Sequence, residues 1–145
     1  MRRDIAVETV LPHPVDAVWQ ALTDPTALAE WVMPVDGFAP VVGQRFRFLA
    51  KPMPGWDGVI NCEVLAVEAP SQLVLRWQGS RMRRPTTVTW SLAPTDGGTR
   101  LRIDHRGFEG PAGVLLAMMH RSGWRKMSGR RLAKVLEAAS ADESR

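Results

Sequence analysis

The sequence predicts an α+β fold in which a curved antiparallel sheet closes around one long C-terminal helix. Three observations predict it: a β-rich segment at the N-terminus, a series of strand-like segments with short turns, and a helical pattern over the last third. Such a set buries its apolar faces together when the sheet curls and the last helix lies in its concave side. The chain has 145 residues, so we expect residues 1–145 to form a single domain around one core.

The first third predicts a strand followed by two short helices. Residues 4–11 are rich in β-forming residues and partly alternate, which is typical of a strand. Pro14 opens a helix, because its fixed φ suits the first turn. Asp24 followed by Pro25 indicates the start of a second helix, which carries Trp31, because Asp caps free N–H groups and proline fits the first helical position.

The middle of the chain predicts an antiparallel meander. Between residues 41 and 106, apolar residues alternate with polar ones, so one face of each strand is apolar and the other meets water. Turn-forming residues separate these segments, and 96–98 is the clearest tight turn. Strands joined in this way pair with their neighbours in sequence.

The last third predicts a long amphipathic helix. Its apolar face is expected to contain Trp124, Met127, Ser128, Arg131, Val135, Ala138 and Ala139. Gly123 weakens the helix, so a bend is expected near it. The segment 140–145 is polar and is expected to be a frayed tail.

Charge and composition restrict the class of protein. The net charge is +4, with arginines clustered at Arg2–Arg3, 81–84 and 121–131. Such clusters can neutralise phosphates. The better explanation is that these arginines lie on solvent-exposed faces and loop tips, so no nucleic-acid partner is predicted. The single Cys62 excludes an intramolecular disulfide framework. Because the sequence has neither a signal-peptide pattern nor an apolar run near 20 residues, we expect a cytoplasmic protein with no membrane span.

The segment PVDAVWQALTDPTALAEW (14–31) is similar to the START and Bet v 1 superfamily (SRPBCC), and more closely resembles the family of the activator of Hsp90 ATPase homologue 1. Further pieces are Gly43 before Phe46, EVLAVEAPSQLVLRW (63–77), Gly98-Thr99-Arg100-Leu101, and His120 followed by Gly123-Trp124. They cover nearly the whole chain in family order. The resemblance implies the helix-grip fold. It does not specify an activity, because the superfamily includes lipid carriers, hormone receptors, polyketide cyclases, oxygenase domains and co-chaperone modules.

Twelve residues are candidate ligand-binding residues, because pockets for small molecules are mostly apolar with a few placed polar groups. They are Trp31, Phe46, Phe48, Met53, Trp56, Trp77, Trp90, His105, Met119, Trp124, Met127 and Arg131. The alternative for most of the aromatic and Met residues is ordinary core. Met53 and Trp56 are the strongest candidates of this group, since a turn-rich loop has little reason to carry bulky apolar side chains.

Two of the candidates are polar. His105 shares strand parity with Leu101 and Ile103, so we expect it to point inward, as a hydrogen-bonding group for a ligand or as a satisfied core residue. Arg131 would hold a ligand carboxylate or phosphate, or else pack its stem and leave its head in water.

Catalytic and metal motifs are not found in the sequence. There is no nucleophile elbow and no glycine-rich phosphate loop, and the three histidines lack metal-ligand spacing, so no catalytic residue, metal or cofactor is predicted. Asp104 and His105 are neighbours in a strand and should point to opposite faces. The direction of Glu63 stays open.

Three functions follow from this pattern. The favoured one is binding of a hydrophobic or aromatic small molecule in a cavity between the sheet and the C-terminal helix. The second is a cyclase or hydrolase that uses the same pocket, with His105, Glu63 or Arg131 as its polar group. The third is a protein-interaction module of the co-chaperone kind, with a filled core and a basic helix face. The apolar stretch 110–119 would cover the pocket or form a subunit contact, which leaves a homodimer open.

Overall fold

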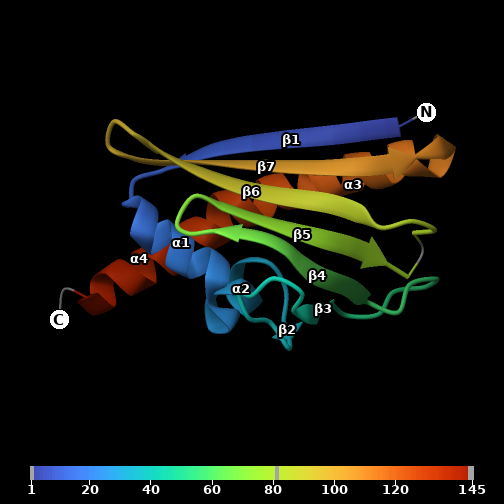
Figure 1. The fold of residues 1–145 in the computed structure, drawn as a ribbon, viewed down its shortest axis with the longest axis horizontal. Coiled ribbons are helices and arrows are strands. Elements are labelled where there is room, and N and C mark those ends of the chain that lie inside the picture. Colours follow the sequence, from blue (N-terminus) through green and yellow to red (C-terminus); the bar gives the residue numbers. More distant parts are fainter. Residues whose placement is uncertain (1, 81, 144–145) are drawn as a thin grey trace.

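The structure is a computed structural model that describes residues 2–80 and 82–143. Its strands form one antiparallel sheet in the order β1-β7-β6-β5-β4-β3-β2 (Figure 1). The elements are β1 (Arg2–Leu11), α1 (Val15–Thr23), α2 (Pro25–Trp31), β2 (Val35–Asp36), β3 (Arg45–Leu49), β4 (Val59–Glu68), β5 (Gln72–Gly79), β6 (Thr86–Thr95), β7 (Gly98–Glu109), α3 (Gly110–Lys126), the π-helical segment η1 (Met127–Arg131) and α4 (Leu132–Glu143).

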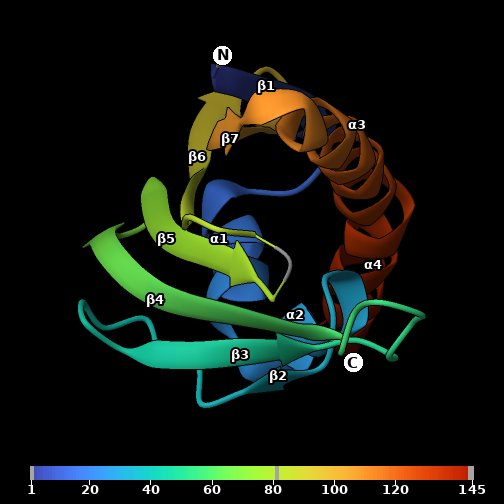
Figure 2. The same ribbon diagram turned by 90° about the vertical axis from the view of Figure 1, so that its right-hand side faces the viewer.

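The sheet curls around the helices, as the sequence predicts. In Figure 2 the strands form a curved wall on one side, and the continuous helix α3-η1-α4 closes the other. Because β1 pairs with β7, the meander from β3 to β7 is extended by the N-terminal strand rather than by a further hairpin. This is the helix-grip arrangement. Within the described residues, no helix has the length and apolar character required to cross a bilayer.

The two short helices begin where the sequence predicts. Pro14 precedes α1, and α2 starts at Pro25. The Asp24 carboxylate accepts a hydrogen bond of 3.2 Å from the backbone N–H of Ala27, so it caps α2. The capped helix carries Trp31, which is completely buried and donates through its indole N–H to the carbonyl of Ala21, 3.0 Å away.

Replacing Asp24 by alanine is expected to lower the free energy of unfolding by about 1 kcal/mol, because an N-cap side chain contributes about that much. Urea unfolding followed by tryptophan fluorescence measures the loss. Asp24→Asn keeps a capping oxygen and should remain within a few tenths of the wild-type value. An Asp24→Ala protein as stable as the wild type would show that this cap contributes nothing.

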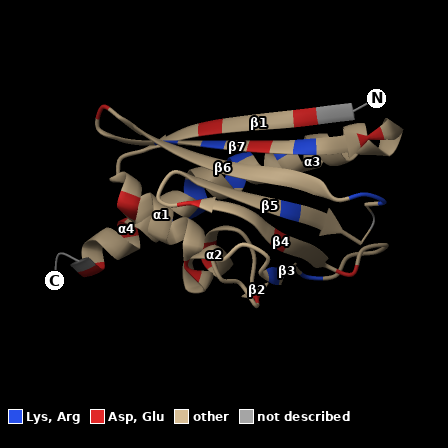
Figure 3. Cartoon of the chain, viewed as in Figure 1, with Lys and Arg blue, Asp and Glu red and all other residues tan. Residues whose placement is uncertain are grey.

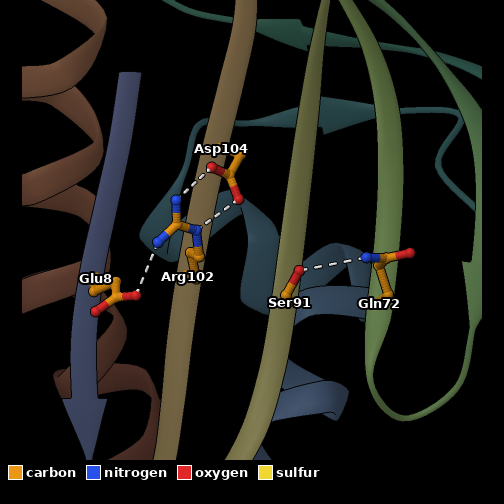
Figure 4. Close-up of polar contacts among 5 residues, drawn as sticks. All are labelled: Glu8, Gln72, Ser91, Arg102 and Asp104. Carbon is orange, nitrogen blue, oxygen red and sulfur yellow. Dashed lines mark hydrogen bonds and ion pairs between the residues drawn. The ribbon is translucent and has the colours of Figure 1, made fainter. Parts of the chain in front are cut away.

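The outer face of the sheet carries polar and charged side chains that pair across neighbouring strands, as Figure 4 shows around Arg102. Arg102 donates to Glu8 at 3.0 Å and to Asp104 at 2.9 Å. Glu63 also lies on this face, within 3.4 Å of Arg45 and 3.6 Å of Arg76, which settles its direction. Asp104 and His105 point to opposite faces of β7, as expected, since His105 is completely buried.

The C-terminal helix differs from the regular α-helix assumed from sequence. Its irregularity is the π segment at 127–131 and not a bend at Gly123. The buried positions from the last turn of α3 onward are spaced by four residues: Trp124, Ser128, Leu132 and Leu136. In a regular α-helix, positions four apart drift by about 40° per step. The extra residue in the π turn rotates the helix back, which keeps these residues on one face.

Two expectations for this helix were therefore wrong. Ala138 and Ala139 are exposed, and Leu132 and Leu136 take their places in the core. Arg131 is also on the exposed side. The helix continues through Ser140 to Glu143, whereas the last two residues lie outside the described part of the chain.

Candidate functional site

Tryptophan rings fill the interior between the sheet and the helices. Trp31, Trp77, Trp90 and Trp124 are each at most 1% exposed. Their ring centroids are 5.2 Å apart for Trp31 and Trp90, 5.9 Å for Trp90 and Trp124, and 5.1 Å for Trp77 and Trp124. The four rings thus form one continuous packed row, in agreement with the ordinary-core alternative that the sequence left open for them.

A hydrogen-bonded chain runs through this core and centres on His105. The indole N–H of Trp124 donates to His105 Nδ1 at 3.0 Å, so this nitrogen is an acceptor and the hydrogen is on Nε2. Nε2 then donates to Thr86 Oγ1 at 2.7 Å. The Thr86 hydroxyl in turn donates to the carbonyl of Trp77, also at 2.7 Å. The chain connects β5, β6, β7 and α3.

A second histidine is fixed in the same way from α3. The indole N–H of Trp77 donates to His120 Nε2 at 3.2 Å, so His120 carries its hydrogen on Nδ1, which donates to the carbonyl of Leu116 at 2.8 Å. The rings of His120 and His105 are perpendicular, with centroids 5.0 Å apart. Phe108 packs against both, at 4.5 Å from His105 and 5.1 Å from His120.

Both histidines are held neutral. Burial, and secondarily the neighbouring His120, lowers the pKa of His105 well below its ordinary value. Burial also lowers the pKa of His120, although the hydrogen bond to Leu116 opposes this shift. Since the nitrogens of both rings are already hydrogen-bonded, neither ring has a free lone pair for a general base. The pair fastens α3 to the sheet.

A pocket of about 770 Å³ lies at the end of the grip, where β7 passes into α3. This hollow, the mouth pocket, is formed by the loop before β6, the end of β7 and the first turns of α3. Its lining residues are Met82, Arg83, Arg84, Thr86, Gly107, Phe108, Glu109, Gly110, Pro111, Ala112, Gly113 and Leu116. In Figure 1 these segments meet at the same end of the sheet.

The floor of the mouth pocket contacts the histidine pair. Thr86 and Phe108 are 2% exposed, and they are the residues that bond to and pack against His105. Gly110 has a φ of +73°, which permits the sharp turn from β7 into α3. A Cβ on Gly113 would lie 3.1 Å from the backbone of Phe108, so α3 begins in close contact with the end of β7.

The twelve candidate residues lie elsewhere. Those fully or almost fully buried in the core are Trp31, Phe46, Phe48, Trp77, Trp90, His105 and Trp124. Trp56 and Met127 are half-buried, and Met53 and Met119 are 61% and 59% exposed. Arg131 donates to the carbonyl of Val32, 3.4 Å away at the end of α2. None of the twelve, all of which are described, contributes to the lining of the mouth pocket.

One feature of the sequence, independent of strand and helix periodicity, does indicate this pocket. Glycine and proline are concentrated in GFEGPAG (107–113), at the junction between the last strand and the last helix. Small residues at such a junction keep side chains out of the space that the pocket occupies. The apolar stretch after it divides: Leu116 lines the pocket, whereas Leu115, Met118 and Met119 face outward.

A second hollow, of about 490 Å³, lies on the outer face of the sheet over β3, β4 and β5. Its arginines are paired with acids, for example Arg47 with Asp36 at 3.0 Å. Burial raises the pKa of the Cys62 thiol beside it, which leaves this cysteine unreactive. Each of its three arginines thus has an acidic partner, and Arg45 and Arg76 share Glu63.

The structure resembles several solved proteins. A protein from Mesorhizobium loti, MLL2253, is 35% identical, with 94% of this chain and 98% of that chain covered and a TM-score of 0.84. DynU16, from the dynemicin biosynthetic locus, is 28% identical with a TM-score of 0.78, and the match covers 94% of this chain but 48% of that one. BH1534 from Bacillus halodurans is 25% identical, covers 93% of this chain and 98% of that chain, and has a TM-score of 0.75.

Among curated proteins, none matches the chain significantly. The family model described as activator of Hsp90 ATPase homolog 1-like protein matches residues 12–137, from just after β1 to the middle of α4. The match includes both short helices, the meander and the strand-to-helix junction that forms the mouth pocket. The chain therefore belongs to the family of activator of Hsp90 ATPase homolog 1-like proteins.

Proposed function

We propose that the protein binds a hydrophobic or aromatic small molecule in the mouth pocket. The observation that carries this proposal is a pocket of about 770 Å³ whose floor is the buried Phe108 and whose wall includes Leu116 and Met82. Ligand pockets typically have volumes of about 300–1,000 Å³ and mostly apolar walls with a few polar groups. The pocket lies between the end of the sheet and the start of the C-terminal helix.

The packed core supports the mouth as the binding region. The row of four tryptophans occupies the middle of the grip, whereas the mouth pocket opens beyond Phe108, where the end of the sheet meets the start of α3. The histidine pair behind the floor fixes Thr86 and Phe108, which makes the pocket pre-formed. A pre-formed pocket lowers the entropic cost of binding. The relative DynU16 comes from a biosynthetic locus, which suits a small-molecule ligand.

Titration with N-phenyl-1-naphthylamine, a neutral aromatic dye, tests the proposal. The wild type should bind the dye with enhanced fluorescence, and Ala112→Trp should weaken binding at least tenfold. Ala112 is an exposed residue in the first turn of α3 that lines the pocket, so a large side chain there fills the space without entering the core. The dye should also raise the melting temperature of the wild type, since a ligand specific for the folded state stabilises it.

Leu115→Trp is the matched control. Leu115 lies on the same helix, is exposed and is not part of the pocket lining, so this variant should bind the dye like the wild type. Melting temperatures of both variants show that they fold. Equal dye binding by Ala112→Trp and the wild type would contradict the location of the site.

A second candidate function is protein interaction, and the filled core favours it. Arg125, Arg130 and Lys134 are exposed on the outer side of the C-terminal helix, where a partner with an acidic surface would meet them. The dye titration separates the two functions, because an interaction module with a filled core does not bind the dye even in the wild-type protein.

A further inference from the structure

We infer that the ligand of the mouth pocket carries an anionic group, a carboxylate or a phosphate, that binds Arg83 at the rim. This inference rests on the proposed function and names the class of its ligand. Among the residues that the structure describes, the mouth pocket has three charged lining residues: Arg83, Arg84 and Glu109. Figure 3 shows basic positions in blue in the loop between β5 and β6, at the end of the sheet where β7 passes into α3.

The three charges are not equivalent. Arg84 pairs with Glu109 at 3.5 Å, across the gap between the loop and the end of β7. Arg83 is exposed, and it has no ion-pair partner within residues 2–80 and 82–143. Within this described part of the lining, Arg83 is therefore the one cation whose charge is not compensated. An anion reaches it without displacing an internal carboxylate, in contrast to the outer hollow, where Glu63 lies between two arginines.

The loop that carries Arg83 is held in position. The N–H of Met82 donates to the carbonyl of Gly79 at 3.0 Å, and the side-chain amide of Gln78 donates to the carbonyl of Met82 at 2.9 Å. The sulfur of Met82 accepts from the N–H of Gly79 at 3.2 Å. These bonds fix Met82 in the wall of the pocket, and Arg83, the next residue, lines the pocket beside it.

The combination defines an amphiphilic ligand. An apolar body fits against Phe108 and Leu116, and a guanidinium at the rim forms paired hydrogen bonds with the oxygens of a carboxylate or phosphate. Arg131, the anchor that the sequence suggested, does not line the pocket and donates to Val32. The anchor is therefore on the loop before β6 and not on the C-terminal helix.

Displacement of N-phenyl-1-naphthylamine by decanoate, decyl phosphate and decanol tests the inference, because the three differ only in their head group. We expect decanoate or decyl phosphate to bind the wild type about tenfold more tightly than decanol. Arg83→Gln should remove this preference and leave the affinities for decanol and the dye unchanged. Arg83→Lys keeps the charge but loses the paired N–H donors of the guanidinium. Its preference for the anionic compounds over decanol should therefore be intermediate.

Arg106→Gln is the matched control, since Arg106 is exposed on β7 and does not line the pocket. It should keep the wild-type preference. Tighter binding of decyl phosphate or of decanoate, lost in Arg83→Gln, supports the inference and identifies which anion is preferred. Equal affinities for all three compounds overturn the inference and leave the proposed function intact. Failure of the wild type to bind the dye overturns the proposed function and the inference with it.

Discussion

Replacing His105 by phenylalanine is expected to lower the free energy of unfolding by about 2–4 kcal/mol. The new ring fills the space but accepts no hydrogen bond, so the indole N–H of Trp124 is left buried without a partner. A buried orphan donor costs about 1–3 kcal/mol, and the hydrogen bond to Thr86 is lost as well. Urea denaturation followed by tryptophan fluorescence measures the difference.

Two variants make this result specific. His105→Gln supplies one acceptor and one donor, so it should recover part of the loss. His13→Phe makes the same substitution in the loop before α1, where the side chain is only half-buried, and should change stability by less than about 0.5 kcal/mol. If His105→Phe is as stable as the wild type, the hydrogen-bonded chain does not fasten α3 to the sheet.

Mild acid is expected to destabilise the protein steeply, starting near pH 6.5. The pKa values of His105 and His120 are lowered in the folded state, whereas in the unfolded chain they are close to the ordinary value of 6.5. As the pH falls through 6.5, the unfolded state therefore binds protons that the folded state does not, and stability decreases. For two histidines the slope reaches about 2.7 kcal/mol per pH unit, until the folded-state pKa values are reached.

Urea midpoints measured between about pH 7.5 and about pH 5 give this slope. His120→Gln removes one of the two groups and should therefore reduce the slope, leaving the contribution of His105. Asp57 does not contribute in this range, because its lowered pKa affects stability only below the ordinary aspartate value of 3.8. A stability that is constant over this range would show that the histidines are not buried in their neutral form.

Local signals predicted much of the fold. Asp24 and Pro25 define the start of α2 through capping chemistry that involves neighbouring residues only, and the tight turn at 96–98 joins β6 to β7. Strand parity placed His105 inward correctly, because alternation is a local property of β7. The family resemblance and the helix-grip fold are confirmed by the family match and the solved relatives.

The candidate site depended on properties that sequence patterns do not contain. Whether Trp77, Trp90 and Trp124 line a cavity or fill it depends on how tightly the sheet curls, which is set by the sum of many contacts. The direction of Glu63 depended on the register of β4, which has an irregularity between Val64 and Ala66. The role of each of the twelve candidates in ligand binding stays a prediction.

The π turn at 127–131 gives the C-terminal helix one residue more than a regular α-helix needs between Trp124 and Leu136. Deleting one residue there would turn the inner spacing into steps of four, three and four, which a regular α-helix keeps on one face, so Leu132 and Leu136 would stay in the core. Adding one residue would instead rotate everything after it by about 100°, and both leucines would leave the core together. Relatives that share this packing should therefore tolerate the loss of one residue in this segment, and place insertions in the surface loops, where an extra residue has little energetic cost.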